Sequence, residues 1–150
     1  MSSNKKTAMI FEDVKINVKI KLSLLWVALM FFYIYADVFS FFQPGIIEEI
    51  MTGEVGDIEI SQVFLLGGAI LMAIPSFMVI LSLVLKAAVN RLVNIIVGIF
   101  HFIVLIGTLF VPGEIWAYYA LYMIFEAVFI VLIVWHAWKW PTQEKAAATS

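Results

Sequence analysis

Two ionisable residues inside long apolar stretches are the residues of this 150-residue chain best placed to do chemistry. Glu126 lies twelve residues after Glu114 and thirteen before Lys139, and His101 lies ten residues after Arg91. In membrane-spanning helices these spacings would place both side chains ~15–20 Å inside the bilayer. Charge at that depth costs a few kcal/mol, so such groups mark candidate sites. We hypothesise a Glu126–His101 pair that handles protons or polarises a ligand.

Two further residues belong to this predicted midplane polar site. Tyr122 lies one turn before Glu126 and is the expected hydrogen-bond partner of the carboxylate. Asn94 shares a helical face with His101, and Gly98 between them would allow a neighbouring helix to approach closely. The alternative is a neutral or paired polar contact that fixes the register of two helices without any chemistry.

The first two apolar stretches contribute secondary polar features. Asp37 lies one turn after Tyr33 in the first stretch, somewhat outward of its middle. Pro75 lies near the centre of the second stretch and predicts a helix kink, because the carbonyl of Leu71 loses its helical donor. No metal site is predicted, because one histidine and one glutamate at the midplane supply too few ligands.

The composition identifies the class of protein to which these residues belong. Hydrophobic residues make up 64% of the chain and charged residues only 13%, whereas a soluble domain is about half apolar and a quarter charged. This balance excludes a soluble enzyme, a disordered chain and a typical nucleic-acid binder. The absence of cysteine excludes disulfides and thiolate metal sites. Phosphate-loop, zinc-protease and serine-nucleophile motifs are also absent, so we expect no cofactor.

Four apolar stretches are long enough to cross a bilayer as helices, which takes about 20 residues each. They predict an all-α membrane protein, a single transmembrane domain over residues 1–150 that forms an antiparallel four-helix bundle. The links after the second and third stretches are short, so we expect the second, third and fourth helices to pack as consecutive hairpins. The expected spans are approximately 20–42, 62–85, 92–112 and 115–138, with an outer loop at 43–61.

The basic residues predict the orientation of these spans. All nine lie in segments that four spans would place on one side of the membrane, and most acidic residues lie in the segments of the other side. Because basic residues favour the cytoplasmic side, we expect cytoplasmic N- and C-termini and an acidic outer face. The basic residues are Lys5, Lys6, Lys15, Lys19, Lys21, Lys86, Arg91, Lys139 and Lys145, and the outer acidic residues are Glu48, Glu49, Glu54, Asp57, Glu59 and Glu114.

Three segments carry a resemblance to a known family: EDVKINVKIKLSLLWVALMFFYIYAD at 12–37, MAIPSFMVILSLVLKAAVNRLVNIIVGIFH at 72–101, and VFIVLIVWHAWKWP at 128–141. Together they resemble an uncharacterised family of small bacterial four-helix integral membrane proteins, broadly DoxX-like in layout. The resemblance implies a multi-pass protein of the bacterial inner membrane. It implies no established activity, so no functional residue is transferred from it.

Three functions are compatible with these features. The first is an accessory protein or a four-helix bundle that binds a lipophilic small molecule. The second is a proton-coupled small-molecule transporter with Glu126 as its midplane carboxylate. The third is a membrane-embedded enzyme that modifies lipids or isoprenoids, with Glu126 and His101 as acid and base; we rank enzymes last. Expected partners are the lipid bilayer, a second copy or another membrane protein, and a lipophilic molecule, but not nucleic acid.

Overall fold

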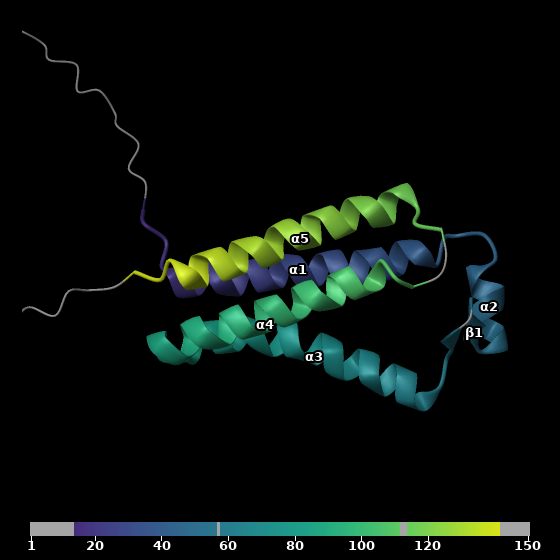
Figure 1. The fold of residues 1–150 in the computed structure, drawn as a ribbon, viewed down its shortest axis with the longest axis horizontal. Coiled ribbons are helices and arrows are strands. Elements are labelled where there is room, and N and C mark those ends of the chain that lie inside the picture. Colours follow the sequence, from purple (N-terminus) through teal and green to yellow (C-terminus); the bar gives the residue numbers. More distant parts are fainter. Residues whose placement is uncertain (1–13, 57, 112–113, 142–150) are drawn as a thin grey trace, which may run out of the picture.

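A computed structural model describes residues 14–56, 58–111 and 114–141 of the chain. Four long helices dominate it: α1 (Val18–Ser40), α3 (Gln62–Val84), α4 (Ala87–Thr108) and α5 (Ala117–Trp138) (Figure 1). Between α1 and α3 lie a short helix, α2 (Ile46–Thr52), and the two-residue strands β1 (Glu54–Val55) and β2 (Ile58–Glu59), which pair antiparallel. All four long helices are long and apolar enough to cross a membrane. The predicted four-helix membrane fold is therefore confirmed.

Polar residues at the helix ends explain where two of the long helices begin. The Asn17 side chain accepts a hydrogen bond from the backbone N–H of Lys19 at 2.9 Å, and Ser61 accepts one from Phe64 at 3.2 Å. These caps satisfy N–H groups that lack helical partners. By contrast, α4 extends from residue 87 to 108, five residues earlier than the expected start of the span at 92. Hydropathy places a boundary at the charged Arg91, but the helix begins before that residue.

Of the two predicted hairpins, the structure confirms the packing of α4 with α5 but not that of α3 with α4. Helix α1 packs along both α3 and α5, and α5 also packs along α4. Helices α3 and α4 are joined by a short link, yet they contact each other little and diverge away from it (Figure 1). Helix α4 instead packs mainly along α5, and its buried residues form one stripe: Asn90, Asn94, Gly98, His101 and Leu105.

The buried core is small and takes side chains from all four long helices. Leu22, Trp26 and Leu29 of α1 pack with Ile130 and Ile133 of α5, and all five side chains are almost fully buried. Most other large apolar side chains of the long helices point outward. This arrangement suits a bundle whose outer surface is covered by lipid rather than by water.

Gly98 produces the close contact between α4 and α5 that its position predicts. A Cβ atom added at Gly98 would lie 2.7 Å from Cγ2 of Val134. This separation is well below the normal 3.5–4.0 Å between carbon atoms. The lack of a side chain at Gly98 therefore allows the two helices to pack directly against each other, one turn before His101.

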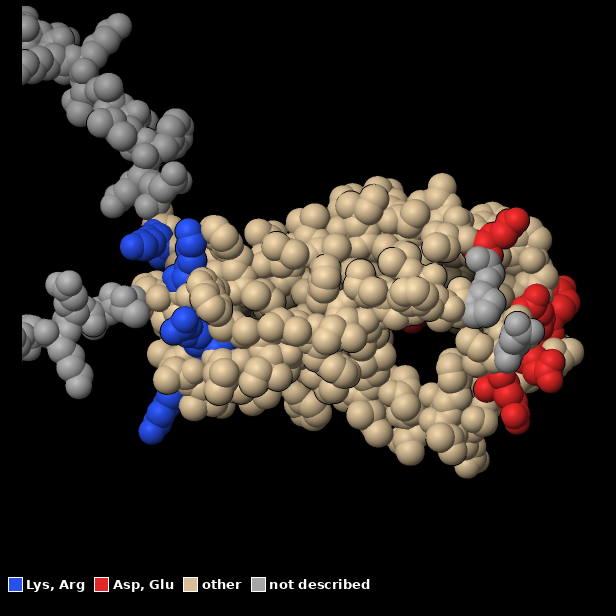
Figure 2. All heavy atoms as spheres, viewed as in Figure 1, with Lys and Arg blue, Asp and Glu red and all other residues tan. Residues whose placement is uncertain are grey.

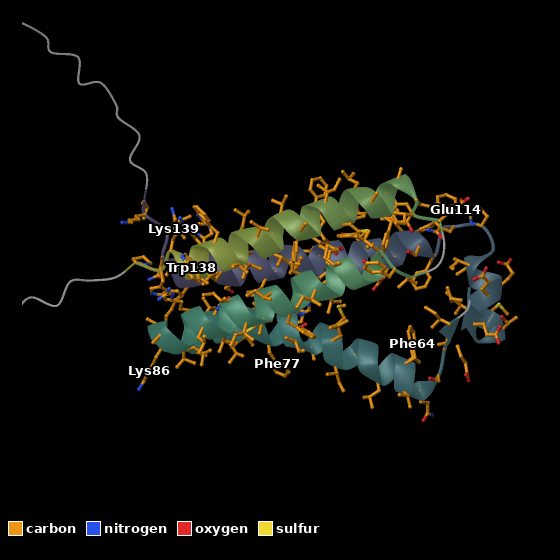
Figure 3. The ribbon with its side chains drawn as sticks, in the orientation of Figure 1. Phe64, Phe77, Lys86, Glu114, Trp138 and Lys139 are labelled. Atoms are coloured by element: carbon orange, nitrogen blue, oxygen red, sulfur yellow. The ribbon has the colours of Figure 1, made fainter. Side chains whose placement is uncertain are left out.

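Apart from Asp37 and Glu126, which line a cavity between the helices, the charged side chains of the described residues lie toward the two ends of the bundle. Lys and Arg gather where α1 begins and α5 ends, and Asp and Glu gather around α2 and the start of α5 (Figure 2). At the basic end, Arg91 lies 5.8 Å from the ring centroid of Trp138 and Lys139 lies 4.1 Å from that of Trp135. Lys86, Lys139 and Trp138 mark this end in Figure 3, and Glu114 marks the other. Lys5, Lys6, Lys145 and Asp57 lie outside the described residues.

Candidate functional site

A cavity of about 120 Å³ lies between the long helices, and residues predicted to lie at the membrane midplane are among its lining. All four long helices contribute to its wall, and six of the eleven lining side chains carry a polar group. The polar lining residues are Tyr33, Asp37, His101, Thr108, Tyr119 and Glu126; the apolar ones are Ala36, Leu71, Met72, Val104 and Leu105. Two predicted site residues, Glu126 and His101, therefore line one cavity, together with both predicted secondary residues, Asp37 and Tyr33.

His101 is nearly fully buried and makes one side-chain hydrogen bond. Its Nδ1 lies 3.3 Å from the hydroxyl of Tyr33, and the two rings stack with centroids 6.0 Å apart. The edge of Trp26 packs against the imidazole at 5.9 Å. Nε2 is buried and has no hydrogen-bond partner among the described residues. A buried nitrogen that has lost water without gaining a partner is uncommon and requires an explanation.

Glu126 is 7% exposed and reaches the cavity from α5. Among the described residues, the hydrogen-bond partner of the His101 imidazole is Tyr33 rather than this carboxylate. Glu126 and His101 thus share a cavity without forming a hydrogen-bonded pair. A small molecule in the cavity would be able to contact both groups.

Tyr122 does not line the cavity. Its ring packs against Phe32 and Phe39 of α1, with centroids 5.8 and 6.1 Å apart. Tyr119 lines the cavity with Glu126 instead. At about 100° per residue, Tyr119 and Tyr122 flank Glu126 at roughly 20° and 40° on opposite sides of the helix. Which tyrosine faces the cavity depends on the rotation of α5 against α1.

Asn94 belongs to a separate polar cluster nearer the basic end. Its Oδ1 accepts hydrogen bonds from Nε1 of Trp26 at 2.7 Å and from Oγ of Ser82 at 3.3 Å. Its Nδ2 donates to Oδ1 of Asn90 at 2.7 Å, and Nδ2 of Asn90 donates to the carbonyl of Ser82 at 2.6 Å. All four residues are buried, the cluster joins α1, α3 and α4, and none of its members lines the cavity. Our interpretation of the sequence missed the roles of Trp26 and Ser82, although the Asn90–Asn94 spacing of one turn was visible.

Lys19 reinforces this end of the bundle. Its Nζ donates to the carbonyls of Leu85 at 2.7 Å and Leu83 at 3.3 Å, which end α3. Terminal carbonyls of a helix lack internal partners and favour a nearby cation. The interaction ties the start of α1 to the end of α3.

Pro75 is buried within α3, and the helix continues through it. Proline removes the N–H that would bond to the Leu71 carbonyl, and Ser76 Oγ donates to the carbonyl of Met72 at 2.8 Å. Leu71 and Met72 both line the cavity. Pro75 therefore alters the backbone hydrogen bonding of the turn of α3 that forms part of the cavity wall. This helix is the one that diverges from α4 in Figure 1.

A second cavity of about 470 Å³ lies between the midplane cavity and the acidic end. Helix α2, the β1–β2 hairpin and the start of α5 surround it, and Glu49 and Glu114 are among its lining residues. Thr108 and Tyr119 line both cavities, so the two adjoin. Figure 2 shows the molecule hollowed at this end.

Within residues 14–56, 58–111 and 114–141, no group of three or more His, Cys, Asp or Glu side chains is placed to hold a metal ion.

The fold and the charge distribution define a multi-pass membrane protein with four spanning helices. The chain belongs to the family of unknown function DUF6326, whose model matches residues 8–147. Membership of an uncharacterised family, as the resemblance implied, is confirmed. Searches of curated proteins and of solved structures found no match to this chain.

Proposed function

We propose that this protein binds a small lipophilic molecule whose polar group occupies the midplane cavity. The observation that carries the proposal is the convergence of Asp37, His101 and Glu126, from three different helices, on one cavity in an otherwise apolar bundle. Ionisable groups at this depth are costly, and they typically mark ligand or ion pathways.

The sizes of the two cavities suggest how such a ligand would lie. A cavity of about 150 Å³ is enough to hold benzene. The midplane cavity, at about 120 Å³, therefore suits one small polar group rather than a whole lipid. The remainder of the ligand would extend past Thr108 and Tyr119 into the larger cavity near the acidic end.

Filling the midplane cavity provides the test. The probes are benzyltrimethylammonium and neopentylbenzene, which have the same shape, added to the protein in lipid nanodiscs while unfolding is followed by tryptophan fluorescence. A bound ligand stabilises the folded state according to its concentration and affinity. We expect at least one probe to stabilise the wild type and to lose this effect in Ala36→Phe and Val104→Phe, whose new rings occupy the cavity.

The control for these variants is Ala69→Phe, because Ala69 is exposed and lines neither cavity. It should respond to the probes as the wild type does. Equal responses of the wild type and both cavity-filling variants would refute binding at this site. So would the absence of any response to either probe.

A second candidate function is proton-coupled transport of the same ligand. Two adjoining cavities favour transport, because together they extend from the acidic end to Glu126. Toward the basic end, the buried side chains of Trp26, Asn94 and their neighbours fill the space between the helices. A carboxylate that binds either a proton or a ligand can couple their movement. Uptake into proteoliposomes driven by a pH gradient, and lost in Glu126→Gln, would distinguish transport from binding alone.

A further inference from the structure

The charged side chains that line the two cavities are all acidic. Asp37 and Glu126 line the midplane cavity, and Glu49 and Glu114 line the outer one. No Lys or Arg of the described segments is among the lining residues, and those residues gather at the opposite end of the bundle (Figure 2). The route to the midplane is therefore lined by acidic side chains, with no Lys or Arg side chain of the described segments beside them.

A buried carboxylate needs a partner, because the low dielectric of the interior raises the cost of an unpaired charge. His101 also lines this cavity; it is 1% exposed, and its Nε2 has no hydrogen-bond partner in the described part of the chain. This unpartnered nitrogen is an observation independent of the two carboxylates. The site thus has both unbalanced charge and unfilled hydrogen-bonding capacity.

The aromatic lining favours the same class of ligand. Tyr33 and Tyr119 both border the cavity and lie on different helices. The faces of aromatic rings attract organic cations, and this attraction increases when water is removed. Two carboxylates and two tyrosines around a volume of about 120 Å³ match the size and charge of a small alkylammonium group.

We infer that the ligand of the midplane cavity is an organic cation, an amine or quaternary ammonium group carried on an apolar body. This inference rests on the proposed binding function and adds its ligand class. The positive group would lie between Asp37 and Glu126, and the apolar body would extend toward the outer cavity.

The two probes of equal shape separate charge from size, since benzyltrimethylammonium carries nitrogen where neopentylbenzene carries carbon. Affinities are obtained in nanodiscs from the dependence of stability on probe concentration. We expect the wild type to bind the cation at least ten-fold more tightly than the neutral probe. Glu126→Gln and Asp37→Asn should each lower affinity for the cation several-fold and leave affinity for the neutral probe unchanged.

Glu48→Gln is the matched control, because it makes the same chemical change on exposed α2 at a residue that lines neither cavity. It should retain the preference for the cation. Retained binding of the neutral probe by Glu126→Gln would show that this variant is folded.

Three results would overturn the inference. Equal wild-type affinity for the two probes, or tighter binding of the neutral one, would reject the ligand class and leave the proposed binding function standing. If Glu126→Gln and Asp37→Asn both kept the preference for the cation, neither carboxylate would be the group that selects a positively charged ligand. Failure of both probes to bind would overturn the inference and the proposed function together.

Discussion

The contact between α4 and α5 at Gly98 provides a sharp test of the packing that positions the site. Replacing Gly98 by alanine places a Cβ atom 2.7 Å from Cγ2 of Val134, so the atoms must separate by about 1 Å to reach normal contact. Valine strongly prefers one side-chain rotamer in a helix, so Val134 cannot easily rotate away. Overpacking of this kind costs about 1–3 kcal/mol.

A matched substitution separates this cost from the intrinsic preference of helices for alanine. Gly107 lies on the same helix, and an added Cβ would meet nothing within 4 Å. Alanine is favoured over glycine within helices by about 1 kcal/mol, and both variants gain this term. Gly98→Ala should therefore be about 1–3 kcal/mol less stable than Gly107→Ala.

The assay is equilibrium unfolding by SDS in mixed micelles, followed by tryptophan fluorescence and far-UV circular dichroism. Because Gly98 lies one turn before His101, separation of α4 from α5 should also weaken binding of benzyltrimethylammonium. A Gly98→Ala variant as stable as Gly107→Ala would show that the helices do not approach as described.

Two other predictions concern the polar cluster and the orientation of the chain. Trp26→Phe removes the hydrogen bond to Asn94 at 2.7 Å and should lower the free energy of unfolding by about 1–2 kcal/mol in the same SDS titration, whereas Trp138→Phe, at a residue that is 64% exposed, should change it little. Equal effects of the two substitutions would contradict a structural role for the cluster. In the naturally cysteine-free chain, Glu48→Cys should react on intact cells with a maleimide that cannot cross membranes, and Lys86→Cys should react only after lysis. Labelling of Lys86→Cys on intact cells, with Glu48→Cys labelled only after lysis, would show that the termini are not cytoplasmic.

The depth of residues along each span was predictable from the sequence, because a helix advances by about 1.5 Å per residue between charged ends. This regularity placed Glu126 and His101 near the middle of neighbouring spans. The glycine at position 98 and the proline at position 75 were recognisable for equally local reasons, a missing side chain and a missing N–H. Four helices and their charged ends followed from hydropathy alone.

The rotation and pairing of the helices were not predictable, because they depend on side chains from several helices at once. The sequence predicts Tyr122 beside Glu126, but the Tyr122 ring packs against Phe32 and Phe39 of α1 and does not line the cavity. Similarly, a short link predicted close packing of α3 and α4. Helix α4 instead packs mainly along α5, and α3 packs along α1.

The central claim, that a ligand occupies the midplane cavity, is tested most directly by photocrosslinking. A diazirine derivative of benzyltrimethylammonium would be activated with the wild-type protein in nanodiscs, and its attachment sites would be mapped by mass spectrometry. We predict adducts on the cavity residues Leu71, Met72 and Val104 that unlabelled benzyltrimethylammonium competes away. Adducts confined to outward-facing residues such as Phe77 and Ile103, unchanged by the competitor, would contradict the claim.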